Sequence, residues 1–179
     1  MSKPTTKKTK AQSWKSKVHT SGDLAEKHVK KMFSLEEPYI EVKSARKRNW
    51  HVVVGMAQLE RNAGKHYCIV VYDRGKKSDK KKSHAQPDRT IAQAFKQPLE
   101  FIFIDGVDLT RQVVKQRHQI RAIISSKRLD VRFYAYLSLR QLRELAGVSY
   151  VIDGHTVYGV PPVMPEDVIP LKPNDDIPF

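Results

Sequence analysis

Between residues 20 and 33, apolar side chains recur at helical spacing. Leu24, His28 or Val29, and Met32 or Phe33 repeat at the spacing of a 3.6-residue turn. Ser21 or Asp23 stands where a helix cap is expected. The pattern predicts a capped helix of about ten residues that ends near Phe33 and is followed by a turn.

The next segment, residues 39–45, alternates like a strand. Side chains two residues apart share a face, so Ile40 and Val42 point into a core while Glu41 and Lys43 share the opposite face. A charged pair in an apolar strand forms a surface ion pair, or it belongs to a binding site. In a binding site, a bound metal ion and a phosphate offset the cost of burying the charges. The tripeptide alone leaves both interpretations open.

Strand and helix patterns continue to residue 158. They predict a strand over 50–54 that forms a hairpin with the first strand, a helix over 56–62, a strand over 66–73, structure over 91–95, a strand over 99–106, a helix over 109–124, a strand over 131–137, a capped helix over 138–146 and a hairpin over 150–158. We therefore expect one α/β (α+β) domain over residues 20–160, with a central mixed sheet flanked by helices.

The opening of this domain resembles the restriction-endonuclease-like superfamily, or PD-(D/E)XK nucleases, which includes restriction enzymes and archaeal Holliday-junction resolvases. The resemblance covers residues 20–75 and rests on Gly22 to Glu26, Glu41-Val42-Lys43, Gln58 and the strand 67–73. It implies a restriction-endonuclease-like fold and a DNA endonuclease or resolvase-like nuclease that uses Mg²⁺ or Mn²⁺. By this resemblance Glu41 binds the metal ion, while Lys43 orients or helps to activate the attacking water.

The sequence departs from that family in one respect. The family places another acid, usually an aspartate after a proline, on a strand upstream of Glu-x-Lys. Only fourteen residues separate Glu26 from Glu41, and most of them are expected to be helical. The missing ligand must come from Glu26, Glu36 or Glu37, or it is absent and the fold binds DNA without cutting it. The candidate catalytic residues are thus Glu41, Lys43 and Glu26, and the candidate metal ligands are Glu41, Glu26 and Glu37.

Charge points to a polyanionic partner. The chain of 179 residues has a formal net charge of +14 and a pI near 9.9, which favours nucleic acid, with an anionic membrane surface as the other possibility. Much of the excess lies in an arm over 1–19 and a loop over 74–89, both poor in apolar residues and expected to be disordered or mobile. The arm could equally be a solubilising tail or an address signal. The predicted phosphate contacts are Lys7, Lys8, Lys10, Arg46, Lys47, Arg48, Lys76, Lys77, Lys80, Lys81 and Lys82.

Membrane and cysteine chemistry are not expected. No apolar run approaches eighteen residues and the lysine-rich start lacks the apolar segment of a signal peptide, so we expect a soluble cytoplasmic protein. Cys68 is the single cysteine, which excludes an internal disulfide and a cysteine-built zinc site. We expect it to be buried in the strand 66–73.

The C-terminal segment, residues 161–179, is proline-rich and acidic. It ends Asp175-Asp176-Ile177-Pro178-Phe179 and resembles the tip of bacterial single-stranded DNA-binding proteins, which docks on repair and replication proteins. Two functions remain open: a metal-dependent nuclease that docks on host DNA-processing proteins, or a non-catalytic DNA-binding protein that mimics or competes with single-stranded DNA-binding protein. The form of the DNA and the existence of a homodimer are also open.

Overall fold

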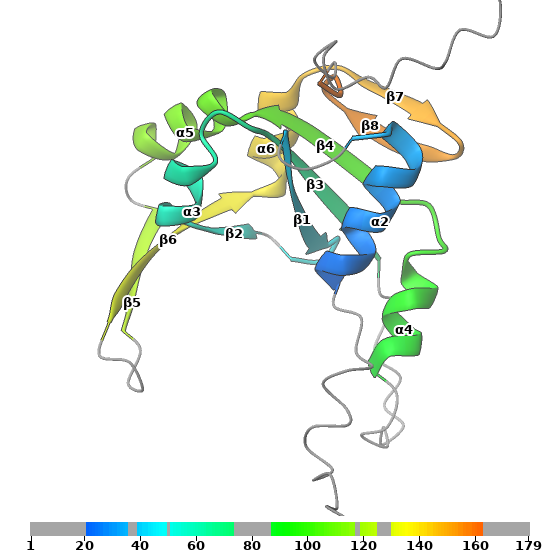
Figure 1. Ribbon diagram of the computed structural model, residues 1–179, viewed down its shortest axis with the longest axis horizontal. Helices are drawn as coiled ribbons and strands as arrows, with labels where there is room; N and C mark the ends of the chain where they lie inside the picture. Colours follow the sequence, from blue (N-terminus) through cyan, green and yellow to red (C-terminus); the bar gives the residue numbers. More distant parts are fainter. Residues whose placement is uncertain are drawn as a thin grey trace, which may run out of the picture.

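The computed structural model describes residues 21–35, 39–49, 51–73, 87–116, 119–124 and 130–162 (Figure 1). The basic arm, most of the lysine-rich loop and nearly all of the C-terminal tail lie outside these ranges. Along the chain the elements are α2 (Ser21–Phe33), β1 (Ile40–Arg46), β2 (His51–Gly55), α3 (Met56–Arg61), β3 (His66–Tyr72), α4 (Pro87–Ala94), β4 (Glu100–Asp105), α5 (Gly106–Lys115), β5 (Ile120–Ile124), β6 (Val131–Ser138), α6 (Leu139–Ala146), β7 (Ser149–Ile152) and β8 (His155–Tyr158).

Two sheets organise these elements. The larger sheet has the order β1-β3-β4-β8-β7, and the smaller has the order β2-β6-β5. In the larger sheet β1 is parallel to β3 and β4 is parallel to β8, while the other neighbours are antiparallel. The smaller sheet is antiparallel throughout. The chain is therefore a single mixed α+β domain, and the predicted mixed sheet is present.

β3 is buried on both faces, as its continuous apolar sequence predicts. Tyr67 and Ile69 face a core that also contains residues of α3, α5, α6 and the smaller sheet. Cys68 and Val70 face a second core built with α2 and residues near the end of α4. Figure 1 shows α2 and α4 on one side of the larger sheet and the smaller sheet on the other.

The predicted hairpin between the first two strands is wrong. β1 pairs with β3, whereas β2 leaves the larger sheet and pairs with β6, with Val52 opposite Leu137. A turn does follow β1, because Asn49 N–H donates to the Arg46 carbonyl at 2.8 Å. Buried Val52 and Val54 nevertheless pack into the core between the two sheets. Tertiary packing therefore determines the partner of β2.

The predicted helix over 109–124 is also wrong in its second half. α5 ends at Lys115, and Ile120–Ile124 form β5. The spacing of Leu109, Val113, Ile120 and Ile124 fits a helix, but Ile120 and Ile124 are β-branched and favour a strand once β6 is available as a partner. α4 begins at Pro87, so the predicted loop over 74–89 ends earlier than expected.

The elements after residue 131 follow their local signals. Ser138 caps α6, its side chain accepting from Gln141 N–H while the Gln141 side chain accepts from Ser138 N–H. α6 ends at Gly147, whose φ of 88° suits a glycine. β7 and β8 form the predicted hairpin around Asp153 and Gly154, which have φ values of 48° and 78°.

Two further expectations concern the cysteine and membranes. Cys68 is fully buried, and this burial raises the pKa of its thiol well above the usual value. No helix in the described ranges combines the length and apolar character needed to cross a membrane.

Candidate functional site

Glu41 and Lys43 lie side by side on β1, at one end of the larger sheet. They share the strand face of Ala45, which belongs to the core between the sheets, while Ile40 and Val42 pack on the opposite side. The Lys43 Nζ is 3.0 Å from the Glu41 Oε1, and the two side chains are 23% and 15% exposed. This is a half-buried ion pair rather than a solvated surface pair.

α3 supplies two amides that complete the surroundings of this pair. The Gln58 Nε2 donates to the Glu41 Oε1 at 2.5 Å, and the Gln58 Oε1 accepts from the Lys43 Nζ at 2.7 Å. The Asn62 Nδ2 donates to the Glu41 Oε2 at 3.2 Å. Gln58 and Asn62 lie four residues apart, so one face of α3 and its C-cap presents both to β1. We call Glu41, Lys43, Gln58 and Asn62 the Glu41 cluster.

Tyr67 lies beside Glu41 in the register of β1 and β3. Its hydroxyl is buried and makes no hydrogen bond of good geometry, although the Asn62 side chain lies close enough to interact with it. Burial and the negative charge of Glu41 raise the pKa of Tyr67 to about 12, and nearby Asn62 offsets part of the rise. The cluster therefore lies in an environment that disfavours a further negative charge unless a cation accompanies it.

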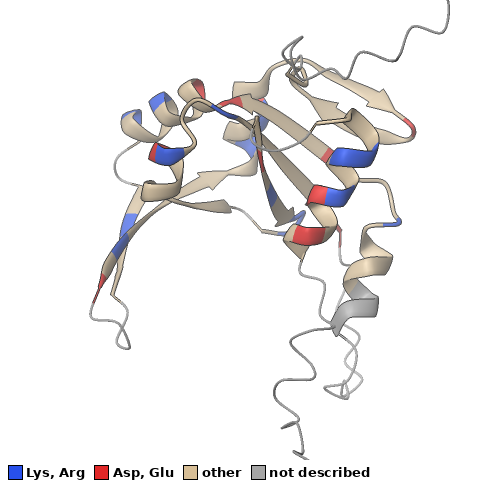
Figure 2. Cartoon of the chain, viewed as in Figure 1, with Lys and Arg blue, Asp and Glu red and all other residues tan. Residues whose placement is uncertain are grey.

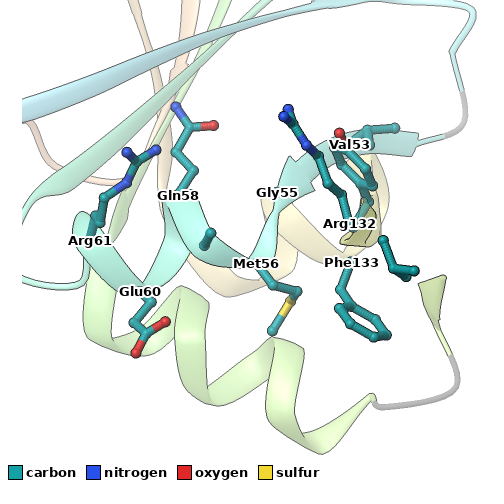
Figure 3. Close-up of a pocket in the computed structure, with 11 residues that line it drawn as sticks. Val53, Gly55, Met56, Gln58, Glu60, Arg61, Arg132 and Phe133 are labelled. Atoms are coloured by element: carbon teal, nitrogen blue, oxygen red, sulfur yellow. The ribbon is translucent and has the colours of Figure 1, made fainter. Parts of the chain in front are cut away.

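A surface cavity of about 720 Å³ adjoins Gln58. It is lined by residues of β2, α3 and the near end of β6: Val53, Gly55, Met56, Ala57, Gln58, Glu60, Arg61, Val131, Arg132, Phe133 and Tyr134. In Figure 3 the side chains of Gln58, Arg61 and Arg132 extend to one side of this cavity, whereas those of Met56, Glu60 and Phe133 extend to the other. Both cationic side chains of the lining thus lie on the side to which Gln58 extends.

A second cavity, of about 580 Å³, brings the basic turn after β1 to α6. Its lining residues are Lys47, Arg48, Asn49, Ser138, Leu139, Arg140 and Arg143, with four cations and no acid among them. Two of the cations have acidic partners nearby: Arg143 binds Glu100 through two hydrogen bonds, and Arg140 pairs with Glu144. We call this the cationic cavity.

The structure brings some of the predicted site residues into contact and leaves others far apart. Glu41 and Lys43 meet, and Gln58, noted only through the family resemblance, joins them. Glu26 is exposed on α2, which packs on the opposite face of the larger sheet, where the Ser44 hydroxyl donates a 3.0 Å hydrogen bond to that of Ser21. The structure therefore does not bring Glu26 to Glu41.

Other predicted residues lie elsewhere. Arg46, Lys47 and Arg48 are exposed at the end of β1, and two of them line the cationic cavity. The remaining candidates lie outside the described residues: Glu36, Glu37, Lys7, Lys8, Lys10, Lys76, Lys77, Lys80, Lys81, Lys82, Asp175, Asp176, Ile177, Pro178 and Phe179. Across the described ranges, no three histidine, cysteine or acidic side chains are grouped so that they could hold a metal ion.

Sequence patterns did not indicate Asn62, Tyr67, Arg140 or Arg143 as site residues. The positions of Asn62 and Arg140 depend on how α3 and α6 pack, which no local pattern encodes.

Comparison with protein-family models, curated proteins and solved structures found no match for the chain. The contacts of the Glu41 cluster and the two cavities are thus the observations that bear on function.

Proposed function

We propose that the protein binds DNA and cleaves it with a divalent metal ion, Mg²⁺ or Mn²⁺, held at Glu41. The observation that supports this most directly is the half-buried pair of Glu41 and Lys43, 3.0 Å apart and fixed by Gln58. A half-buried ion pair adds little to stability, so its presence here is better explained by a site than by folding. The resemblance to PD-(D/E)XK nucleases assigns the same two residues to metal binding and catalysis.

The Glu41 cluster supplies some of the oxygen ligands that a hard cation such as Mg²⁺ needs. Glu41 offers a carboxylate, and Asn62 offers a side-chain carbonyl that is not used in its bond to Glu41. Mg²⁺ commonly binds one or two protein carboxylates and completes its shell with waters and substrate phosphate. The ion would act as a Lewis acid on the phosphate. The Lys43 ammonium would stabilise negative charge on the phosphate, and Gln58 would keep Lys43 and Glu41 oriented.

The cationic cavity supports the DNA-binding half of the proposal. Lys47 and Arg48 follow β1 directly, and Arg140 and Arg143 reach the same hollow from α6. Cations gathered without an acid in the lining suit phosphate oxygens, which position a nucleic acid without reading its sequence. The lysine-rich segments outside the described residues add to the same overall charge of +14.

A second candidate is a DNA-binding protein without catalysis. The favouring observation is that, in the part of the chain that the structure describes, no second acid joins Glu41 in a metal-binding group. In this alternative the C-terminal tip, through Phe179 and the acids before it, would compete for proteins that bind single-stranded DNA-binding protein.

Glu41→Gln and Lys43→Met test the catalytic proposal. Cleavage of single-stranded, duplex and branched DNA is measured with Mg²⁺ and with Mn²⁺. We expect each variant to lose about 100-fold or more in rate, because a charge acting on the transition state is removed. Binding measured in EDTA should stay close to that of the unmodified protein.

Glu60→Gln is the matched control, since Glu60 is an exposed acid of α3 that extends to the other side of the cavity in Figure 3. Its cleavage rate should be unchanged. Unmodified protein that binds DNA but cuts no form of it with either metal would refute catalysis and leave the non-catalytic function.

A further inference from the structure

β6 presents two different faces. Val131, Phe133, Ala135 and Leu137 lie on one face, which joins the core between the sheets at its buried end. The alternate residues Arg132, Tyr134, Tyr136 and Ser138 share the other face, because side chains alternate along a strand. We call these four residues the β6 track. From Arg132 to Ser138 the track runs about 20 Å at the usual rise of a strand.

Neighbouring strands hold the aromatic rings of the β6 track in place. Arg121 of β5 is opposite Tyr134 in the register, and its guanidinium lies 5.0 Å from the centre of the Tyr136 ring. His51 of β2 approaches the same ring edge-on, with ring centres 6.4 Å apart. Gly55 is opposite Tyr134 on the other side and places no side chain beside its ring. Both tyrosines are therefore half-buried, and the Tyr136 ring packs against Arg121 and His51.

The two ends of the β6 track meet the two cavities. Arg132 and Tyr134 line the cavity that adjoins Gln58, and Arg132 extends to the same side as Gln58 in Figure 3. Ser138, at the other end, lines the cationic cavity with Lys47 and Arg140. The track thus connects the surroundings of the Glu41 cluster with the cationic cavity.

Charge along the track is suited to an anionic chain. Figure 2 shows basic residues on the arm formed by β5 and β6, and these include the exposed Arg121 and Arg132. Asp130 is the one acid described on this arm, and it pairs with Arg132 at 2.9 Å. That pair is about half exposed on the arginine side, so a phosphate can compete for Arg132.

We propose that the β6 track binds single-stranded nucleic acid, with bases stacked on Tyr134 and Tyr136. Arg121, Arg132 and the cationic cavity contact its phosphates. Aromatic rings ordered between cations are the arrangement that binds single strands without sequence preference. A duplex keeps its bases stacked on one another, so it gains nothing from tyrosine rings on the strand. The inference rests on the proposed function for its DNA ligand and adds the form of the substrate.

The test compares binding of three ligands to the full chain in EDTA by fluorescence anisotropy. The ligands are an oligothymidine of about 15 nucleotides, a duplex of the same length and an oligonucleotide of the same charge with abasic sites. We expect Tyr134→Ala and Tyr136→Ala each to weaken oligothymidine binding about 10-fold, since stacking one base has roughly that effect. Their binding of the duplex and the abasic strand should change less than twofold.

Two controls separate stacking from loss of structure. Tyr134→Phe with Tyr136→Phe keeps both rings and should bind oligothymidine within about twofold of the unmodified protein. Tyr150→Ala removes a tyrosine that is 37% exposed from β7 at the far end of the larger sheet, and should have no effect. Photo-crosslinking of a 4-thiothymidine strand should attach it to the peptide that contains Tyr134 and Tyr136.

The outcomes distinguish this inference from the proposed catalysis. If Tyr134→Ala and Tyr136→Ala bind oligothymidine like the unmodified protein, or lose duplex and abasic binding equally, the β6 track is not a stacking surface, whatever Glu41 does. Ring-dependent binding in a protein that cuts no DNA would support the track and refute catalysis. A chain that binds none of the three ligands would refute both.

Discussion

Removing the hydroxyl of Tyr67 should stabilise the protein. The ring is fully buried between β1 and β4, yet the hydroxyl makes no hydrogen bond of good geometry, even with the nearby Asn62 side chain. A buried polar atom without a partner costs about 1 to 3 kcal/mol, and Tyr67→Phe removes that atom while it keeps the ring and its packing. We therefore expect the free energy of unfolding to rise by about 1 kcal/mol at pH 7, which corresponds to about 2 to 4 °C in the unfolding temperature of a chain this size.

The same substitution should also change the response to alkaline pH. An unfolded tyrosine ionises near pH 10, whereas the folded Tyr67 keeps its proton to about 12. Between these values the unfolded state binds fewer protons than the folded state, so the stability of the unmodified protein falls as pH rises. Tyr67→Phe lacks this contribution. Its advantage over the unmodified protein should therefore be constant below pH 10 and should widen above it.

Urea unfolding followed by circular dichroism, from pH 7 to pH 11.5, measures both effects, and comparison of the two proteins cancels the titration of the lysines. Loss of more than about 1 kcal/mol in Tyr67→Phe at pH 7 would refute the reasoning. It would mean that the hydroxyl is bonded in solution, with the Asn62 side chain as its partner.

Two other changes have clear expectations. Gly106→Ala should lower the free energy of unfolding by at least about 1 kcal/mol. A Cβ at this position would collide with the Lys65 carbonyl and lie 2.7 Å from the Ala63 carbonyl oxygen. Gly64 has open space around it, so Gly64→Ala should be nearly neutral in the same urea titration. Deleting Phe179 should abolish pull-down of proteins that recognise the tip of single-stranded DNA-binding protein, since such a pocket takes the terminal ring and carboxylate together; full capture by the truncated chain would show that the tip is not a docking motif.

Local signals were sufficient for much of the fold. The continuous apolar run of β3, the capping pair Ser138 and Gln141, and the Asp153-Gly154 turn each specify their own element, because they act within a few residues. The partner of β2 could not be predicted in this way. Val52 and Val54 alternate as a strand would, but their pairing with β6 depends on residues more than eighty positions away.

The site was predictable to a similar extent. The two-residue period of a strand predicts that Glu41 and Lys43 share one face, and their charged atoms lie 3.0 Å apart. The other proposed acid, Glu26, could not be judged from its spacing along the chain. Its distance from Glu41 in sequence is short, but the larger sheet lies between α2 and the face that carries Glu41.

The tyrosines of β6 were missed for a different reason. Tyr134 and Tyr136 lie in an ordinary strand pattern, and nothing in the order of residues 131–137 places Arg121 and His51 beside them. Because residues 120–124 were interpreted as helical, β5 was not predicted. The packing of Arg121 on the Tyr136 ring was therefore not predicted either. An error about one strand therefore concealed the arrangement on which the proposed binding surface rests.

α3 gives the two proposals a physical connection. Its N-terminus continues directly from β2, a strand of the smaller sheet that also carries Tyr134. Its Gln58 bonds both Glu41 and Lys43 of the larger sheet and also lines the cavity that Arg132 reaches. A strand held along β6 would consequently approach the Glu41 cluster past Gln58, a side chain that touches both regions. In both proposals, a single short helix would connect the Glu41 cluster with the β6 track and would help to orient a bound phosphate.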